Sequence, residues 1–327
     1  MIANIAMTYV CPITHEPLIK SPEGLRTASG ATYPLIEGSI VDFIAGAPQA
    51  TVNESVHAMY HSAHAGEIYR NFLDWLFASF EQDEEEFRKQ LISRLQLKRG
   101  DTVLVTGCGL GEDLLPIARA IGPSGRLYAQ DLSKTMVLHA SANFAKQCDI
   151  LIPEFSVGDA LSLPFSADTF DAVFHFGGIN LFGDMAGAIA EMARVTRVGG
   201  RVAFGDEGVA PWLRNSEYAK VAINNIPLWA SPLPLEHLPH HIQDVHCSWV
   251  LGNCFYMIDF AVSAQGPTMN IDVPHKGRRG GTARTRYYGQ LEGVSPATRS
   301  KVVDAAAREG ISVHEWLERK LAEVPTR

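Results

Sequence analysis

The sequence predicts an α/β protein built around an open, mostly parallel sheet whose last strand is antiparallel. Three observations predict this fold. Short apolar runs alternate with helix-like runs between residues 101 and 208, glycines follow the first apolar run, and residues 246–262 alternate like two antiparallel strands. Alternating strand and helix units with right-handed crossovers give a sheet covered on both faces. We also expect a small N-terminal ribbon and a helical C-terminal appendage.

The parallel strands are expected in five apolar runs. These runs are residues 101–107, 125–131, 151–160, 169–178 and 201–208. The helices between them, with apolar residues at helical spacing, are expected over residues 111–122, 133–147 and 184–200. Ser133 is the expected N-cap of the second helix, and Gly199 and Gly200 are expected to end the third. Ligands of such a sheet bind beyond the carboxyl ends of its strands.

The stretch "VLVTGCGLGED" (103–113) places glycines where the first strand passes into the first helix. A helix N-terminus offers unpaired N–H groups, and glycines let the backbone approach a ligand closely, so this stretch predicts a binding loop. A dinucleotide loop GxGxxG starting at Gly107 needs a glycine at position 112, where this chain has Glu112. The negative charge of a carboxylate at this position would repel a bound pyrophosphate. The spacing therefore favours S-adenosylmethionine, which carries an ammonium and a sulfonium group.

This stretch resembles motif I of class I methyltransferases, V-L-D-x-G-C-G-x-G, and the resemblance covers roughly residues 95–265. The resemblance implies a Rossmann-like methyltransferase sheet, S-adenosylmethionine as cofactor and S-adenosylhomocysteine as product. One position departs from the family, because Val105 stands where motif I has an acid. We expect another group to replace the water-mediated contact of that acid to the methionine ammonium.

The resemblance also assigns individual cofactor contacts. Asp131, at the end of the second strand, matches the acid that holds both ribose hydroxyls. Asp159 and Ala160 would meet adenine, and Met136 would pack on its face. The complete set implied is Thr106, Gly107, Cys108, Gly109, Gly111, Asp131, Leu132, Met136, Asp159, Ala160 and His175. Plainer interpretations stay open: the glycines as an ordinary tight turn, Asp131 as a helix cap and Met136 as a core residue.

Residues 1–48 are expected to form a separate small module. Within it, residues 9–44 resemble the zinc-ribbon domain that precedes some bacterial methyltransferases and also occurs as a methyltransferase-activator protein. Only Cys11 matches a ligand of that ribbon. The other ligand positions hold Thr14, Arg26 and Ser29, so we expect a ribbon without zinc. A fainter similarity to the metal-free U-box domains exists, and we expect a docking or substrate-facing role.

Residues 49–98 are expected to form two helices that act as a lid over the cofactor. His57, His61 and His64 share one face of the first helix. A metal site there is conceivable, but no carboxylate or cysteine stands at matching spacing, so no metal is expected.

The cofactor-binding domain is expected over residues 99–266. Its segment 210–241, which is rich in tryptophan and proline, would shape a pocket for a small, largely hydrophobic acceptor. Methyl transfer depends mostly on alignment, with a base only where the acceptor must lose a proton. The candidate bases are His175, Asp206, His64 and Tyr60. His175 could instead only line the cofactor pocket.

Residues 267–327 are expected to form a basic linker and an oligomerisation tail. After the basic stretch 275–286, the pattern predicts a strand over 287–294 and two helices that begin at Ser295 and Ser312. This order resembles a ribbon-helix-helix module, which pairs across a two-fold axis. We therefore expect a homodimer through the tail, or a tail that covers the active site of a partner.

The charge and the cysteine content limit the classes of protein to which the chain could belong. A net charge of −8 argues against general affinity for nucleic acid. Five cysteines in no CxxC pair, with no signal peptide and no membrane span, are typical of a cytoplasmic protein. Two alternatives stay open: an RNA methyltransferase that grips its substrate with the ribbon and the basic tail, and a non-catalytic S-adenosylmethionine-binding protein.

Overall fold

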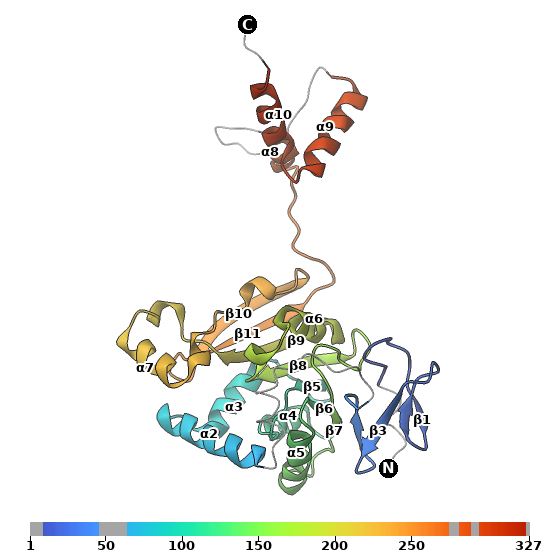
Figure 1. The fold of residues 1–327 in the computed structure, drawn as a ribbon, viewed down its shortest axis with the longest axis vertical. Coiled ribbons are helices and arrows are strands. Elements are labelled where there is room, and N and C mark those ends of the chain that lie inside the picture. Colours follow the sequence, from blue (N-terminus) through green and yellow to red (C-terminus); the bar gives the residue numbers. More distant parts are fainter. Residues whose placement is uncertain (1–8, 46–63, 275–280, 289–293, 325–327) are drawn as a thin grey trace. The chain divides into compact units, whose positions relative to one another are not determined.

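The computed structural model of the 327-residue chain describes residues 9–45, 64–274, 281–288 and 294–324. The chain divides into two compact units, Met1–Pro267 and Thr268–Arg327. In the first unit, the strands of the described residues form one sheet in the order β1-β2-β3-β4-β7-β6-β5-β8-β9-β11-β10 (Figure 1).

The centre of this sheet is parallel, as the sequence predicts. Its five parallel strands are β7 (Glu154–Val157), β6 (Arg126–Asp131), β5 (Thr102–Thr106), β8 (Phe170–Phe176) and β9 (Thr196–Glu207). β11 (Phe255–Val262) runs antiparallel to β9 and pairs with β10 (Ile242–Val250), which confirms the two antiparallel strands expected over 246–262. The fold is therefore α/β with a Rossmann-like, mostly parallel sheet.

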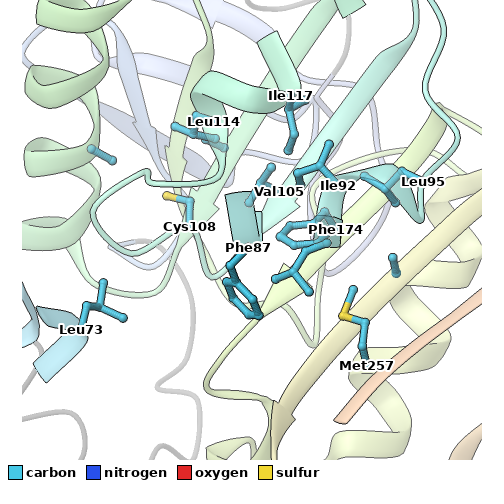
Figure 2. Close-up of a cluster of buried hydrophobic side chains, with 14 of the residues drawn as sticks. Leu73, Phe87, Ile92, Leu95, Val105, Cys108, Leu114, Ile117, Phe174 and Met257 are labelled. Carbon is cyan, nitrogen blue, oxygen red and sulfur yellow. The ribbon is translucent and has the colours of Figure 1, made fainter. Parts of the chain in front are cut away.

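Helices pack on both faces of the sheet. Within the described residues, the helices of the first unit are α2 (Ala65–Ser79), α3 (Glu84–Ser93), α4 (Leu114–Ile121), α5 (Lys134–Gln147), α6 (Met185–Val195) and α7 (Glu217–Asn225). Short 3-10 helices follow β8 at Ile179–Leu181 and β9 at Pro211–Leu213, and two more lie between α7 and β10 at Pro227–Ala230 and Leu235–His237. Leu114 and Ile117 of α4 pack with Val105, Phe174 and Phe87 in one apolar layer (Figure 2). Ile189 and Met192 of α6 belong to the layer on the opposite face.

The sequence predicts the start of α5 correctly and the end of α6 wrongly. Ser133 caps α5, because its Oγ accepts a hydrogen bond from the Met136 N–H at 3.3 Å. The prediction that Gly199 and Gly200 end the third helix is wrong. α6 stops at Val195, and the following residues already pair in β9, where ladder hydrogen bonds replace those of the helix.

The N-terminal ribbon is continuous with the central sheet. Its strands are β1 (Ile19–Ser21), β2 (Gly24–Arg26), β3 (Thr32–Ile36) and β4 (Ile40–Asp42). β4 pairs in parallel with β7, with Val41 opposite Ser156, so the ribbon extends the sheet rather than standing apart. The Cys11 Sγ lies 3.0 Å from the Tyr33 hydroxyl and accepts a hydrogen bond from the Thr14 N–H at 3.3 Å.

The second unit contains α8 (Ala283–Tyr288), α9 (Pro296–Arg308) and α10 (Val313–Ala322). The predicted caps are confirmed, since the Oγ atoms of Ser295 and Ser312 accept N–H bonds at the starts of α9 and α10. The predicted strand over 287–294 is wrong at its start, because Tyr287 lies in α8, a helix that begins after the Thr282 side chain accepts the Thr285 N–H. Residues 289–293 lie outside the described residues. No helix in the described ranges is long and apolar enough to cross a membrane.

Candidate functional site

A cavity lies at the carboxyl ends of β5, β6, β7, β8 and β9, where the fold predicts a ligand. The loops after β5 and β7, the start of α5 and the ends of β6 and β8 form one part of its wall. Side chains of α2 and α3, together with residues 176–183, Glu207 and Phe255, form the rest. The cavity therefore draws on elements spread from α2 to β11.

Two of the three motif glycines face this cavity. Gly107 and Gly109 have φ angles of +58° and +53°, in the left-handed region that glycine tolerates best. A Cβ on Gly107 would lie 2.8 Å from the His175 Cε1, so a side chain has no room there. Gly111 has a different role. A Cβ there would meet Ala140 of α5 at 3.2 Å, so this glycine permits close packing around the loop and does not line the cavity.

Asp131 joins the glycine loop to the end of β6. Its Oδ2 accepts a hydrogen bond from the Gly109 N–H at 2.9 Å, and its Oδ1 accepts one from the Ser133 N–H at 2.8 Å. Burial raises the pKa of this carboxyl, although these backbone donors oppose the rise. Ser133, not Asp131, supplies the cap of α5. Asp131 therefore lies in the cavity wall as a positioned acceptor.

The remaining cofactor candidates divide into two groups. Leu132, Met136, Asp159 and Ala160 line the cavity together with Asp131. Thr106 and Cys108 do not. The Thr106 Oγ1 lies 3.3 Å from the His175 Nδ1, and Cys108 belongs to the apolar layer under α4 (Figure 2).

His175 lines the cavity from the end of β8. Its Nδ1 lies 2.9 Å from the Thr106 carbonyl oxygen, which can only accept, so we assign the ring proton to Nδ1. The Nε2 is then an acceptor, and within the described residues it is buried without a hydrogen-bond partner. Burial lowers the pKa of this imidazole, which favours the neutral ring.

The other candidate bases lie away from the cavity or outside the described residues. Asp206 is fully buried behind the wall, where its Oδ2 accepts the Asn180 N–H at 2.6 Å and its Oδ1 accepts the Glu207 N–H at 2.8 Å. His64 precedes α2 with its side chain 80% exposed and does not line the cavity. Tyr60, His57 and His61 fall outside the described residues.

Three polar residues of the cavity wall were missed from the sequence. Gln130 precedes Asp131, and neither polar atom of its carboxamide has a partner among the described residues. Arg88 of α3 reaches the cavity and pairs with Glu84 at 2.6 Å and with Asp113 at 2.9 Å. Glu207 ends β9 directly after Asp206. Alternation along β9 was an available signal for Glu207 alone, because neighbouring strand residues point to opposite faces and Asp206 faces away from the cavity.

Part of the cavity wall is aromatic. Tyr69, Phe72 and Phe77 of α2 line it together with Phe176 and Phe255. Phe176 and Phe255 stack with their ring centroids 5.9 Å apart. The wall thus combines polar groups such as Asp131 with aromatic rings suited to a ring-shaped ligand. Among the residues that the structure describes, no group of three or more His, Cys, Asp or Glu side chains is arranged to hold a metal ion.

Comparisons with known proteins agree with this fold. Residues 103–200 match the family described as Methyltransferase domain. The phosphoethanolamine N-methyltransferase 2 of Haemonchus contortus, solved with S-adenosyl-L-methionine, is 16% identical with a TM-score of 0.50 over 67% of this chain and 62% of that chain. Residues 103–200 therefore match a methyltransferase domain, and the chain shares the Rossmann-like fold of the Haemonchus contortus enzyme.

Two curated relatives are similar to part of this chain in sequence. The demethylmenaquinone methyltransferase of Geobacillus sp. (strain WCH70) is 28% identical over 151 residues, which is 46% of this chain and 59% of that protein. The protein of that name from Staphylococcus carnosus (strain TM300) is 32% identical over 122 residues, 37% of this chain and 49% of that protein. The chain thus spans about half the length of these relatives.

Proposed function

We propose that the protein transfers a methyl group from S-adenosylmethionine to a small, largely hydrophobic organic acceptor. The observation that carries this proposal is the composition of the cavity wall. The wall holds the glycine loop and the Asp131 carboxylate together with aromatic side chains from α2, β8 and β11. A cofactor and an apolar acceptor can meet in such a cavity without water between them.

The residues present fit S-adenosylmethionine. Gly107 and Gly109 line the cavity without side chains, so their backbone can approach a ligand closely, and Asp131 presents a carboxylate suited to two ribose hydroxyls. Asp159 and Ala160, with Met136, provide a polar and apolar wall for adenine. When bound, the cofactor supplies an electrophilic methyl group and leaves as S-adenosylhomocysteine.

The protein's own contribution is alignment in a dry cavity. The aromatic rings exclude water and hold the acceptor, and the neutral His175 presents an acceptor nitrogen near the glycine loop. Orientation of this kind supplies most of the acceleration of an in-line displacement. The curated relatives act, by name, on demethylmenaquinone, so a quinone-like ring is the acceptor to assay first.

The experiment has a binding step and a transfer step. The wild type should bind S-adenosylhomocysteine in a calorimetric titration and transfer a radiolabelled methyl group from S-adenosylmethionine to demethylmenaquinone, offered oxidised and reduced. Asp131→Ala should lose most of the binding. Asp74→Ala, which removes an exposed carboxylate paired with Arg70, is the matched control and should bind like the wild type. Absence of binding by the wild type would contradict the proposal.

The homodimer expected through the second unit remains a proposal. Only Ala306 and Val313 are buried in its described residues, so this unit has little core of its own. Pairing of two such units would supply the missing burial. Light scattering of the full chain tests it, and a monomeric mass across the protein concentrations used would contradict it.

A further inference from the structure

Glu207 brings a carboxyl group to the aromatic part of the cavity. It is the last residue of β9, it lines the cavity and it lies directly opposite Phe255 of β11 in the sheet register. Phe255 stacks on Phe176, so the carboxyl stands beside the aromatic wall. Asp131 and Asp159, the other carboxyls of the wall, belong to the end formed by β6 and β7.

The surroundings of Glu207 make its carboxylate a stronger base than an exposed one. Burial raises the pKa of Glu207 well above its ordinary value, and the neighbouring Asp206 raises it further. Tyr256 of β11 also faces this pair, and burial and the two carboxyls raise its pKa, so it stays neutral. The neutral His175 faces Asp206 from β8. Arg88, the cation of the cavity wall among the described residues, is already paired with Glu84 and Asp113.

We propose that Glu207 accepts the proton of the methyl acceptor, and that this acceptor carries a weakly acidic hydroxyl group on an aromatic ring. The proposal rests on the proposed function and narrows its acceptor to one chemical class. Glu207 would touch the acceptor itself, whereas Asp206 lies behind the wall and would not contact the acceptor.

The charge and shape of the cavity favour an aromatic hydroxyl over other classes of methyl acceptor. A carboxylate would be repelled by Asp206 and Glu207. An amine would be held here as an ammonium ion, because the adjacent carboxylate favours the protonated form, and an ammonium nitrogen has no lone pair for attack. An aromatic hydroxyl fits the ring-lined wall, is neutral on entry and becomes a better nucleophile when it gives up its proton.

The step balances without a further reactant. The acceptor O–H bond breaks, the proton passes to the Glu207 carboxylate and the electron pair stays on oxygen. That oxygen forms a bond to the methyl carbon while the bond from sulfur to that carbon breaks, with its electron pair remaining on sulfur. Glu207 then releases the proton to solvent, so the net products are the methyl ether, S-adenosylhomocysteine and one proton.

The test compares two probes that differ in one hydrogen-bond donor. 1-Naphthol and 1-methoxynaphthalene are titrated at pH 8 into the full chain saturated with S-adenosylhomocysteine, and binding is followed by naphthalene fluorescence. The wild type should prefer 1-naphthol by about tenfold or more, since a hydrogen bond to a charged acceptor is worth that much. Glu207→Gln, which keeps the shape and removes the charge, should lose most of this preference.

A second carboxyl provides the matched control. Glu154 in β7 is a strand residue whose pKa burial also raises, and it does not line the cavity, so Glu154→Gln should keep the wild-type preference. A wild type without the preference, or a Glu207→Gln variant that keeps it, would overturn the proposal. Loss of S-adenosylhomocysteine binding in Glu207→Gln would also overturn it, because the carboxyl would then serve the cofactor. If the wild type itself fails to bind S-adenosylhomocysteine, the proposed function fails instead.

Discussion

Replacing Gly107 by alanine tests how the glycine loop is built. The added Cβ would lie 2.8 Å from the Cε1 and 3.1 Å from the Nδ1 of His175, whose ring is buried and held by the Thr106 carbonyl. The φ angle of +58° adds about 1–2 kcal/mol for any residue with a Cβ. Displacing a packed ring adds about 1–3 kcal/mol. We therefore expect Gly107→Ala to lower the free energy of unfolding by about 2–5 kcal/mol.

Gly109→Ala is the matched comparison. Its φ angle is nearly the same, at +53°, but a Cβ there meets its nearest neighbour, the Tyr69 Cε1, at an ordinary 3.6 Å. Gly109→Ala should therefore lower the free energy of unfolding only by the cost of the left-handed backbone conformation, about 1–2 kcal/mol. Urea denaturation of both variants, followed by circular dichroism, measures the difference. Equal losses in the two variants would refute the claim that the His175 ring closes the space beside Gly107.

Three further predictions follow from the same contacts. Because the pKa of Glu207 is higher in the folded chain than in the unfolded chain, its contribution to stability is fully present below the unfolded pKa and is lost as the pH rises through the folded one. Glu207→Gln should therefore gain stability relative to wild type as the pH rises from about 4 to 8, and a pH-independent difference in urea denaturation would contradict this. Arg88→Ala should destabilise the fold by about 3–5 kcal/mol by removing the partner of Asp113 and one of the two partners of Glu84, whereas Lys89→Ala, on the exposed side of α3, should leave the unfolding midpoint unchanged. A chain ending at Pro267 should keep S-adenosylhomocysteine binding but scatter light as a monomer, and a dimeric mass would show that the second unit does not pair the chains.

Local sequence signals predicted most of the central fold. The strand runs, the cap at Ser133 and the caps at Ser295 and Ser312 depend on nearby residues, and the structure has them where they were expected. The end of the third helix was placed wrongly at Gly199 because this residue already belongs to β9, which pairs with β8. Pairing with a distant strand is not visible in the local sequence. Tyr287 was misread because tyrosine favours strands, whereas the hydrogen bond at Thr282 starts a helix.

The site was predictable in outline but not in the direction of its side chains. Gly107, Gly109, Asp131 and Asp159 reach the cavity as the motifs indicated. Asp206 and Glu207 are neighbours with the same chemistry, and only the orientation of β9 decides that the second one faces the cavity. Gln130 and Arg88 belong to no motif, and they reach the cavity only through the packing of β6 and α3.

The most direct test of the central claim is a calorimetric titration of the wild-type chain with S-adenosylhomocysteine and, separately, with NADH. The glycine spacing, which has Glu112 where the dinucleotide pattern GxGxxG needs a glycine, predicts saturable binding of S-adenosylhomocysteine and none of NADH. Binding of NADH without binding of S-adenosylhomocysteine would contradict the account.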